Sequence, residues 1–298
     1  MDDQRKHLTP LRKRLEAVSK TEGIRLDVIQ QDYLLTWILI GISRQEELRK
    51  SLIFKGGTAL KKCYFGDYRF SEDLDFSSIP LCPQGDPLEK TLMHICDDLQ
   101  NTLDKYAPIS LEFQRYQEKH PHPFNQEAFV VRAQFPWQRM PLTKVMIEIS
   151  HEEQLVLPPL EKPIIHSYEE KLHNSLLVYP LEEIISEKLR AILQNTKKIH
   201  EQGWGRSRVR DYYDLYYILT QFSSDISWRK INQSLSKKCE FKGIIYREVK
   251  DFFDPVFVKE AKNSWGQWLV PLSHNPPNFD TVLEKLQTLI LSEVNVGF

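Results

Sequence analysis

The stretch from residue 54 to 77, FKGGTALKKCYFGDYRFSEDLDFS, holds the residues whose types and spacing best suit chemistry. Two aspartates, Asp73 and Asp75, alternate with large apolar residues, so on a strand both carboxylates share one face. Two like charges at neighbouring positions repel each other, and a bound cation would explain why they are tolerated. Carboxylate oxygens suit Mg²⁺, which proteins hold with one or two carboxylates, water and substrate phosphates. The alternative is a solvated edge strand.

Ahead of the aspartates, Gly56 and Gly57 precede a short segment with helical spacing of apolar residues. Adjacent glycines let the backbone approach another group closely, and the first N–H groups of a helix carry partial positive charge. This pattern is typical of a phosphate cradle. It also suits a tight turn in which Thr58 caps a helix.

Together, the two motifs resemble the hGG and DxD signature of the polymerase-β-like nucleotidyltransferases. The sequence FKGGTALKK followed by RFSEDLDF more closely resembles the AbiEii and MenT group of toxins. The resemblance implies Mg²⁺ or Mn²⁺ held by Asp73 and Asp75, and a nucleoside triphosphate held by residues of the two motifs. These nucleotide-binding positions are Gly56, Gly57, Thr58 and Ser71.

A third metal-binding carboxylate commonly comes from a neighbouring strand in that superfamily, and Glu148 is the candidate here. Residues 143–150 alternate so that Val145, Ile147 and Ile149 share one face and Glu148 lies on the other. An exposed strand glutamate is the equally weighted alternative.

Lys188 lies on the apolar stripe of a predicted helix over residues 181–193. Its side chain either snorkels to the surface or presents a compact positive charge to a triphosphate. By resemblance to the EKLxA-type helix of the same toxins, we expect Lys188 to be catalytic.

Residues 210–215, RDYYDL, resemble the [RK]DxxDL motif of the group, which places Asp211 in the active site as a base or as a partner that positions Lys188. Helix capping or pairing with a nearby arginine is the alternative for Asp211. For Asp214, three residues on, we expect only a supporting role.

Residues 188–210 carry seven Lys or Arg against one acid, Glu201. The run ends in GWGRSRVR, where glycines, an aromatic ring and the alternating Arg206, Arg208 and Arg210 suit a mobile loop that contacts RNA. A solvated charged face is the simpler explanation.

Composition limits the class of protein. With 298 residues, 41% hydrophobic, and a formal charge of −1, the chain can bury a large core, and any RNA contact must be local. The four cysteines show no zinc spacing, and the histidines at 120 and 122 lie between prolines in a stiff loop. Without a long apolar run or a signal-peptide pattern, we expect no membrane association and a cytoplasmic protein.

The remaining periodicity predicts an α/β fold. Helices are expected within residues 8–50, including 26–42, and over 88–106, and strands over 109–116, 129–135 and 143–150. The resemblance implies a polymerase-β-like core, a small mixed sheet flanked by helices, over residues 1–165. A mainly helical C-terminal lobe then covers residues 166–298.

The expected activity is a metal-dependent transfer of a nucleoside monophosphate to an RNA. By resemblance the acceptor is the 3′ end of tRNA, and the protein is a growth-inhibiting toxin with a separately encoded antitoxin. The alternatives are a small-molecule nucleotidyltransferase of the antibiotic-modifying kind and a nucleotide-binding module without catalysis.

Overall fold

A computed structural model describes residues 8–117 and 125–294, so the histidines at 120 and 122 lie outside the described residues. The chain forms two compact units. The first comprises residues 1–153 and 159–178, and the second comprises residues 154–158 and 179–298. Each unit is described by itself below.

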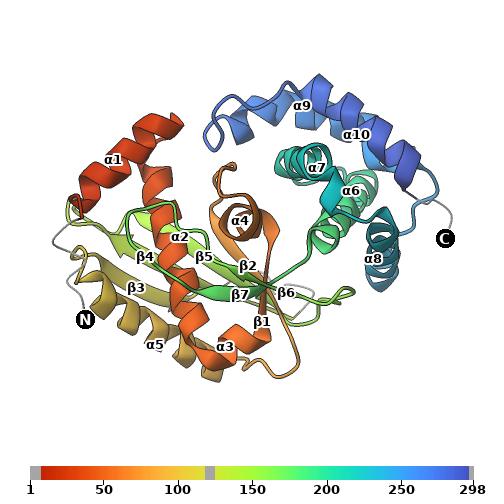
Figure 1. The fold of residues 1–298 in the computed structure, drawn as a ribbon. Coiled ribbons are helices and arrows are strands. Elements are labelled where there is room, and N and C mark those ends of the chain that lie inside the picture. The colour runs from red at the N-terminus through yellow and green to blue at the C-terminus, as the bar shows by residue number, and fades with distance from the viewer. Residues whose placement is uncertain (1–7, 118–124, 295–298) are drawn as a thin grey trace. The chain divides into compact units, whose positions relative to one another are not determined.

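The first unit is built on a seven-stranded sheet of order β3-β4-β5-β2-β1-β7-β6 (Figure 1). The strands are β1 (Leu52–Lys55), β2 (Asp73–Ser78), β3 (Ser110–Arg115), β4 (Gln126–Gln134), β5 (Thr143–Ser150), β6 (Leu160–Pro163) and β7 (Ser175–Val178). The β2/β5 and β1/β7 pairs are parallel and the other pairs are antiparallel. The predicted mixed sheet is therefore confirmed, and the acid-bearing strand β2 lies at its centre.

Helices flank this sheet in the first unit (Figure 1). They are α1 (Leu11–Glu22), α2 (Leu26–Arg44), α3 (Glu46–Ser51), α4 (Gly56–Ala59), a π-helical segment η2 (Leu60–Phe65) and α5 (Asp86–Leu103). Helix α2, predicted from its apolar period, is buried along almost its whole length and packs on β5 and α5. Gly41 allows that close packing, because a Cβ there would lie 2.6 Å from a methyl group of Ile95.

Helix α5 buries the predicted apolar stripe of Leu92, Ile95, Leu99 and Leu103. In the same helix the Cys96 thiol is buried, whereas His94 is exposed. All four cysteines of the chain are free and buried, in keeping with their spacing.

The division between the two units falls at residue 178, later than the expected boundary at 165. The reason is the β6/β7 hairpin, whose two strands belong to the sheet of the first unit. Strand β7 pairs in parallel with β1, with Ile53 opposite Leu177, so residues 159–178 complete the sheet.

The second unit is helical, as predicted. It contains α6 (Leu181–Gln202), α7 (Val209–Gln221), α8 (Trp228–Phe241), α9 (Pro255–Leu269) and α10 (Phe279–Glu293), with 3-10 turns η3 (Ser223–Asp225) and η4 (Val249–Phe253). Helix α6 ends at Gly203, whose φ of 74° gives the left-handed C-cap that glycine favours. Among the described residues, no helix has the length and apolar character needed to cross a bilayer.

A buried carboxylate, Glu183 of α6, holds the short segment 154–158 in the second unit. The backbone N–H groups of Val156 and Leu157 donate to its two oxygens at 3.0 and 3.1 Å. Lys238 of α8 pairs with the same carboxylate at 3.0 Å and donates to the Gln154 carbonyl at 3.2 Å. The segment is thus fixed by hydrogen bonds to charged groups, which are stronger than bonds between neutral groups.

Candidate active site

The first group of predicted site residues lies where β1 turns into α4. Gly56 has a φ of +78°, in the left-handed region that other residues avoid. A Cβ on Gly56 would lie 2.5 Å from Oδ2 of Asp75. The sequence therefore needs glycine at this position twice over, for the backbone turn and for the close approach of a carboxylate.

Strand β2 presents its two aspartates on one face, as predicted. Leu74 and Phe76 point to the other face and are fully buried, and the Phe76 ring lies 5.1 Å from that of Phe54 on β1. Asp73 and Asp75 are half-buried. Both carboxylates therefore remain partly open on the face that also carries the glycine turn.

Glu148 lies directly opposite Asp75 in the parallel β2/β5 pair. Because paired residues of adjacent strands point to the same side, its carboxylate shares the face of the aspartates. Gln126 donates a hydrogen bond of 2.9 Å to Glu148 Oε2. The alternation of β5 is the predicted one, with Val145, Ile147 and Ile149 buried.

The donor set on this face fits a magnesium ion held mainly by substrate and water. Over the described residues, no three His, Cys, Asp or Glu side chains gather closely enough to hold a metal by themselves. Mg²⁺ does not require such a cage, since one or two carboxylates together with phosphates and water suffice. Asp73 and Asp75 are the two carboxylates available on this face, and glycine at position 56 leaves room for the Asp75 carboxylate beside the turn.

Two further predicted residues flank this face. The Thr58 hydroxyl is buried and donates to the Asp73 carbonyl at 2.5 Å, which fastens α4 to the first residue of β2. Ser71 lies in the loop just before β2 and is half-buried. In this structure the Thr58 hydroxyl therefore helps to position strand β2.

Sequence reasoning missed two basic residues beside the glycines, Lys55 and Arg69. Lys55 pairs across the strands with Asp75, so it shares the acidic face, and its ammonium forms a buried ion pair with Glu153. The Arg69 guanidinium lies against Gly57. Both residues belong to the motifs quoted above. Their contacts are with residues far away in the sequence or in another motif, and a local sequence pattern cannot predict such contacts.

In the second unit, the structure joins Lys188 of α6 to α7. Lys188 Nζ lies 2.9 Å from Asp211 Oδ1 and 2.7 Å from Asp214 Oδ2. Its side chain is 9% exposed, so Lys188 does not snorkel to the surface. Asp214, expected only to support the site, is fully buried and contacts the lysine directly.

Asp211 is held in its charged form. Burial opposes its ionisation, but the ammonium of Lys188 and the guanidinium of Arg208, 3.3 Å away, outweigh burial and lower the pKa of the carboxyl. A carboxylate with a lowered pKa is a weak base. Of its two predicted roles, the geometry therefore favours positioning Lys188.

The three alternating arginines have different surroundings. Arg206 is exposed in the loop between α6 and α7, whereas Arg208 pairs with Asp211. Arg210 belongs to α7 and lies 5.3 Å from the Trp268 ring of α9. The loop itself is tied to α6, because the Asn195 side chain accepts a bond of 2.7 Å from the Arg206 N–H.

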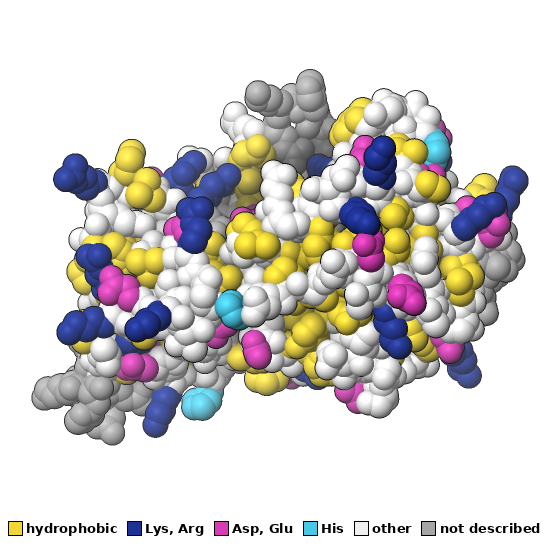
Figure 2. Space-filling view, turned by 90° about the horizontal axis from the view of Figure 1, so that it is seen from above, with side chains coloured by type: hydrophobic (Ala, Val, Ile, Leu, Met, Phe, Trp, Pro, Cys, Tyr) yellow, Lys and Arg dark blue, Asp and Glu magenta, His cyan; other side chains and the backbone are white. Residues whose placement is uncertain are grey.

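On the face drawn in Figure 2, Lys and Arg side chains are scattered among Asp and Glu side chains. This mixture agrees with the formal charge of −1 for the whole chain. Among the described residues of this face, positive charge is interspersed with negative charge and forms no continuous basic surface.

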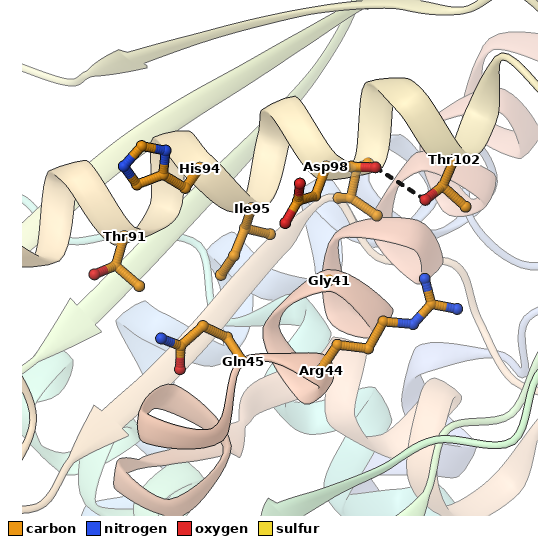
Figure 3. A pocket seen from close by; sticks show the side chains of 9 residues that line it. Gly41, Arg44, Gln45, Thr91, His94, Ile95, Asp98 and Thr102 are labelled. Atoms are coloured by element: carbon orange, nitrogen blue, oxygen red, sulfur yellow. Dashed lines mark hydrogen bonds between the residues drawn. The ribbon is translucent and has the colours of Figure 1, made fainter.

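A separate pocket of about 330 Å³ lies between α2 and α5 and contains none of the predicted site residues (Figure 3). Thr91, His94 and Asp98 of α5 line it across from Arg44 and Gln45. Its walls carry isolated polar groups over an apolar floor, without the paired carboxylates of β2.

Comparisons with known proteins agree with this geometry. A search of curated proteins found no match. Among solved structures, MenT4, a nucleotidyltransferase toxin from Mycobacterium tuberculosis H37Rv, resembles the chain with a TM-score of 0.64 and 19% identity, over 95% of this chain and 90% of that chain. At this identity the likeness concerns the fold.

The family model described as the nucleotidyl transferase AbiEii toxin of type IV toxin–antitoxin systems matches residues 37–285. The match takes in the glycine pair, both aspartates of β2, and Lys188 with its partners Asp211 and Asp214. A nucleotide substrate and an antitoxin partner are implied by that family. The protein therefore belongs to the AbiEii family of nucleotidyltransferase toxins.

Proposed function

We propose that the protein uses a divalent metal, Mg²⁺ or Mn²⁺, to transfer a nucleoside monophosphate from a nucleoside triphosphate to the 3′ end of tRNA. The observation that carries the proposal is that the Asp75 carboxylate occupies the space that a Cβ of Gly56 would need, and that Asp73 lies on the same face of β2. The acidic pair and the glycine turn therefore lie side by side, and the chain belongs to a family of nucleotidyltransferase toxins.

Asp73 and Asp75 would hold the metal, with Glu148 as a third carboxylate on their face. Bound there, the ion would screen the charge of the triphosphate and lower the pKa of the attacking hydroxyl. Gly56 and Gly57 would present backbone N–H groups to the phosphates, and Ser71 would add a hydroxyl contact. Thr58 would serve this binding indirectly, because its hydroxyl is bonded to the Asp73 carbonyl.

Lys188 would offset the negative charge that develops on the leaving pyrophosphate. Asp211 and Asp214 would fix its ammonium, and Asp211 would stay charged because its pKa is lowered. In this scheme the attacking oxygen is the acceptor ribose hydroxyl, the bond between the α- and β-phosphates breaks, and no covalent enzyme intermediate forms.

The acceptor is proposed from the basic residues at the start of α7. Arg206 is exposed, and Arg208 and Arg210 are half-buried. Arginine side chains bind phosphates, and nearby tryptophan rings can stack on unpaired bases. Single-stranded RNA, as found at the end of tRNA, satisfies both requirements.

The test is incubation of the protein with total tRNA and each of the four nucleoside triphosphates, followed by mass spectrometry of the tRNA. We expect a mass gain of whole nucleotides with at least one donor, which is lost on adding a chelator and in Asp75→Ala. Asp98→Ala, a change of the same kind in the α2/α5 pocket, should retain the activity. Transfer to an aminoglycoside with none to tRNA would refute the RNA acceptor, and Mg²⁺-dependent nucleotide binding without any product would refute catalysis.

A further inference from the structure

The two adjacent glycines each make room for a charged group of opposite sign. A Cβ on Gly56 would collide with the Asp75 carboxylate, whereas a Cβ on Gly57 would lie 2.5 Å from NH2 of Arg69 and 3.2 Å from its central guanidinium carbon. Heavy atoms this close overlap, so any side chain at position 57 must displace the guanidinium. The glycine turn is therefore bordered by carboxylate on one side and by guanidinium on the other.

Gly57 differs from Gly56 in its backbone. It belongs to α4 and does not have a positive φ, so its conformation is open to every L-residue. A side chain at position 57 would therefore act through the Arg69 guanidinium, which it would push from its place, and not through the backbone conformation. Gly56 thus has a backbone conformation that favours glycine, whereas at Gly57 only the nearby guanidinium limits the size of the side chain.

Arg69 is itself held in place. It lies in the loop between η2 and β2, is 4% exposed, and donates from NH1 to the Phe70 carbonyl at 3.1 Å. Its guanidinium carbon lies 5.7 Å from the Tyr68 ring. A guanidinium keeps its charge at every working pH, and its rigid fork of donors matches phosphate oxygens.

We propose that Arg69 contacts the phosphates of the nucleotide at the glycine pair, and that Gly57 is glycine because the guanidinium needs the space of its Cβ. This inference rests on the proposed use of a metal-bound nucleoside triphosphate. Under this proposal the two sides of the glycine turn have different ligands. Asp75, beside Gly56, binds the metal, and Arg69, beside Gly57, binds the phosphates. Arg69 is then a substrate-binding residue additional to those expected from the sequence.

A purely structural role for Arg69 makes a different prediction. A guanidinium that only offsets the charge of neighbouring acids would stabilise the fold, and its loss would leave phosphate affinity unchanged in molecules that remain folded. The two roles are therefore separated by measuring phosphate binding and stability in the same variants.

The experiment is titration calorimetry with inorganic pyrophosphate and Mg²⁺, a probe without a base, on Arg69→Lys, Arg69→Met, Gly57→Ala and the Arg69→Met/Gly57→Ala double variant. We expect Arg69→Met to weaken binding by roughly tenfold or more, the value of a lost charged hydrogen bond. Gly57→Ala keeps the arginine but displaces its guanidinium, so binding should weaken here too. The double variant should bind no more weakly than Arg69→Met, because both changes remove one contact.

Arg14→Lys is the matched control, since Arg14 is another buried arginine of the first unit, 5% exposed and paired with Glu170. It should lower the thermal midpoint and leave pyrophosphate binding unchanged. If Arg69→Met does not fold, Arg69→Lys and Gly57→Ala decide the question. Both variants keep a positive charge near the turn, which favours folding, and both lose the placement of the guanidinium at position 57.

Wild-type affinity in folded Arg69→Lys and Gly57→Ala would overturn the inference and leave the proposed function standing. A wild-type protein that binds neither pyrophosphate nor any of the four nucleoside triphosphates would instead overturn the proposed function, and the role of Arg69 with it.

Discussion

Lys62 and Lys188 are both buried and both paired with aspartate, yet their surroundings differ. Lys62 of η2 lies 2.6 Å from Asp32 of α2, with side chains 1% and 2% exposed. The Tyr168 hydroxyl completes that pair by donating to Asp32 at 2.9 Å. Lys188 instead contacts two aspartates, one of which is 16% exposed and also contacts Arg208.

The comparison separates an ion pair whose two side chains are almost fully buried from one with a partly exposed aspartate. Around Asp32, burial opposes ionisation, but the ammonium groups of Lys62 and Lys61 outweigh it and hold the pKa of the carboxyl below its ordinary value. Lys62 is the direct ion-pair partner of Asp32, and Lys61 adds a second positive charge nearby. The Lys188 cluster (Lys188, Arg208, Asp211 and Asp214) reaches the surface at Asp211 and Arg208, where a substrate can meet it. This difference supports the proposed catalytic role of Lys188 and a packing role for Lys62, and the variants below test both.

The largest expected effect comes from removing both ends of the Lys188 pair, as Lys188→Met with Asp214→Leu. Replacing a buried pair by apolar residues of similar size is often tolerated, and Asp211 keeps Arg208 as a partner. We expect nucleotide transfer to fall by at least about a hundredfold, the usual cost of a lost charge stabiliser. Rates with labelled nucleotide, together with circular dichroism melting, measure the two effects separately.

The matched control is Lys62→Met with Asp32→Leu. Tyr168 keeps a partner in this variant, because its hydroxyl also donates to the Ile29 carbonyl at 3.1 Å. Transfer should stay close to wild type. If a folded Lys188→Met/Asp214→Leu protein were equally active, the Lys188 cluster would be structural as well.

The next largest effect concerns stability. Lys62→Met alone leaves the buried Asp32 carboxylate without its ion-pair partner, although Tyr168 still donates to it. We expect the free energy of unfolding to fall by about 3 kcal/mol, the lower end of the cost of breaking a buried pair. Urea unfolding gives this value, and the Lys62→Met/Asp32→Leu variant should recover most of it. A single variant as stable as wild type would show that Asp32 finds another partner.

A third prediction concerns pH and the buried Glu170, which accepts bonds from Tyr33 and pairs with Arg14 at 2.7 and 2.8 Å. Burial opposes its charge, but hydrogen bonds from His166, Tyr33 and Arg14 prevail and lower its pKa from 4.5 to about 2. Because the folded pKa is the lower one, the stabilisation, about 3 kcal/mol, is complete above pH 4.5 and is lost as the pH falls toward 2.

Free energies of unfolding of wild type and Glu170→Gln, measured between pH 6 and 3, test whether the stabilisation by Glu170 falls on acidification. The difference between the two proteins should be constant down to about pH 5 and shrink below it. A difference that grows on acidification would contradict the assignment.

The smallest effect is expected at Arg206, the exposed arginine of the α6/α7 loop. Arg206→Ala should weaken tRNA binding a few-fold and reduce the slope of log affinity against log salt by about 1. Arg229→Ala, an equally exposed change on α8, is the control and should leave the slope unchanged. Equal slopes for Arg206→Ala and wild type would remove this loop from the RNA contact.

Local patterns predicted the parts of the site that lie within single elements. Alternation fixed the shared face of Asp73 and Asp75 and the side of β5 that carries Glu148, because a strand repeats every two residues. Helical spacing likewise placed Lys188 on the buried stripe of α6. The family resemblance added Asp211, which the structure brings to Lys188.

Contacts between distant segments were beyond those patterns. Lys55 meets Glu153 across 98 positions of the chain, and the guanidinium of Arg69 reaches Gly57 from the loop beyond η2. The π-helical turn over η2 and the pairing of β7 with β1 also depend on tertiary packing, which overrides local preference. The supporting role expected for Asp214 stays a prediction, and its contact with Lys188 is visible only in the pairing of α6 with α7.

The path of the chain has a practical consequence for anyone who wishes to study one unit alone. Residues 154–158 belong to the helical unit, yet residues 159–178 return to the sheet. A fragment beginning at residue 179 would lack the backbone donors that Val156 and Leu157 offer to Glu183. A single cut therefore either removes two hydrogen bonds from the buried Glu183 or leaves the sheet incomplete. A separable helical half would need residues 154–158 joined to it by a designed linker.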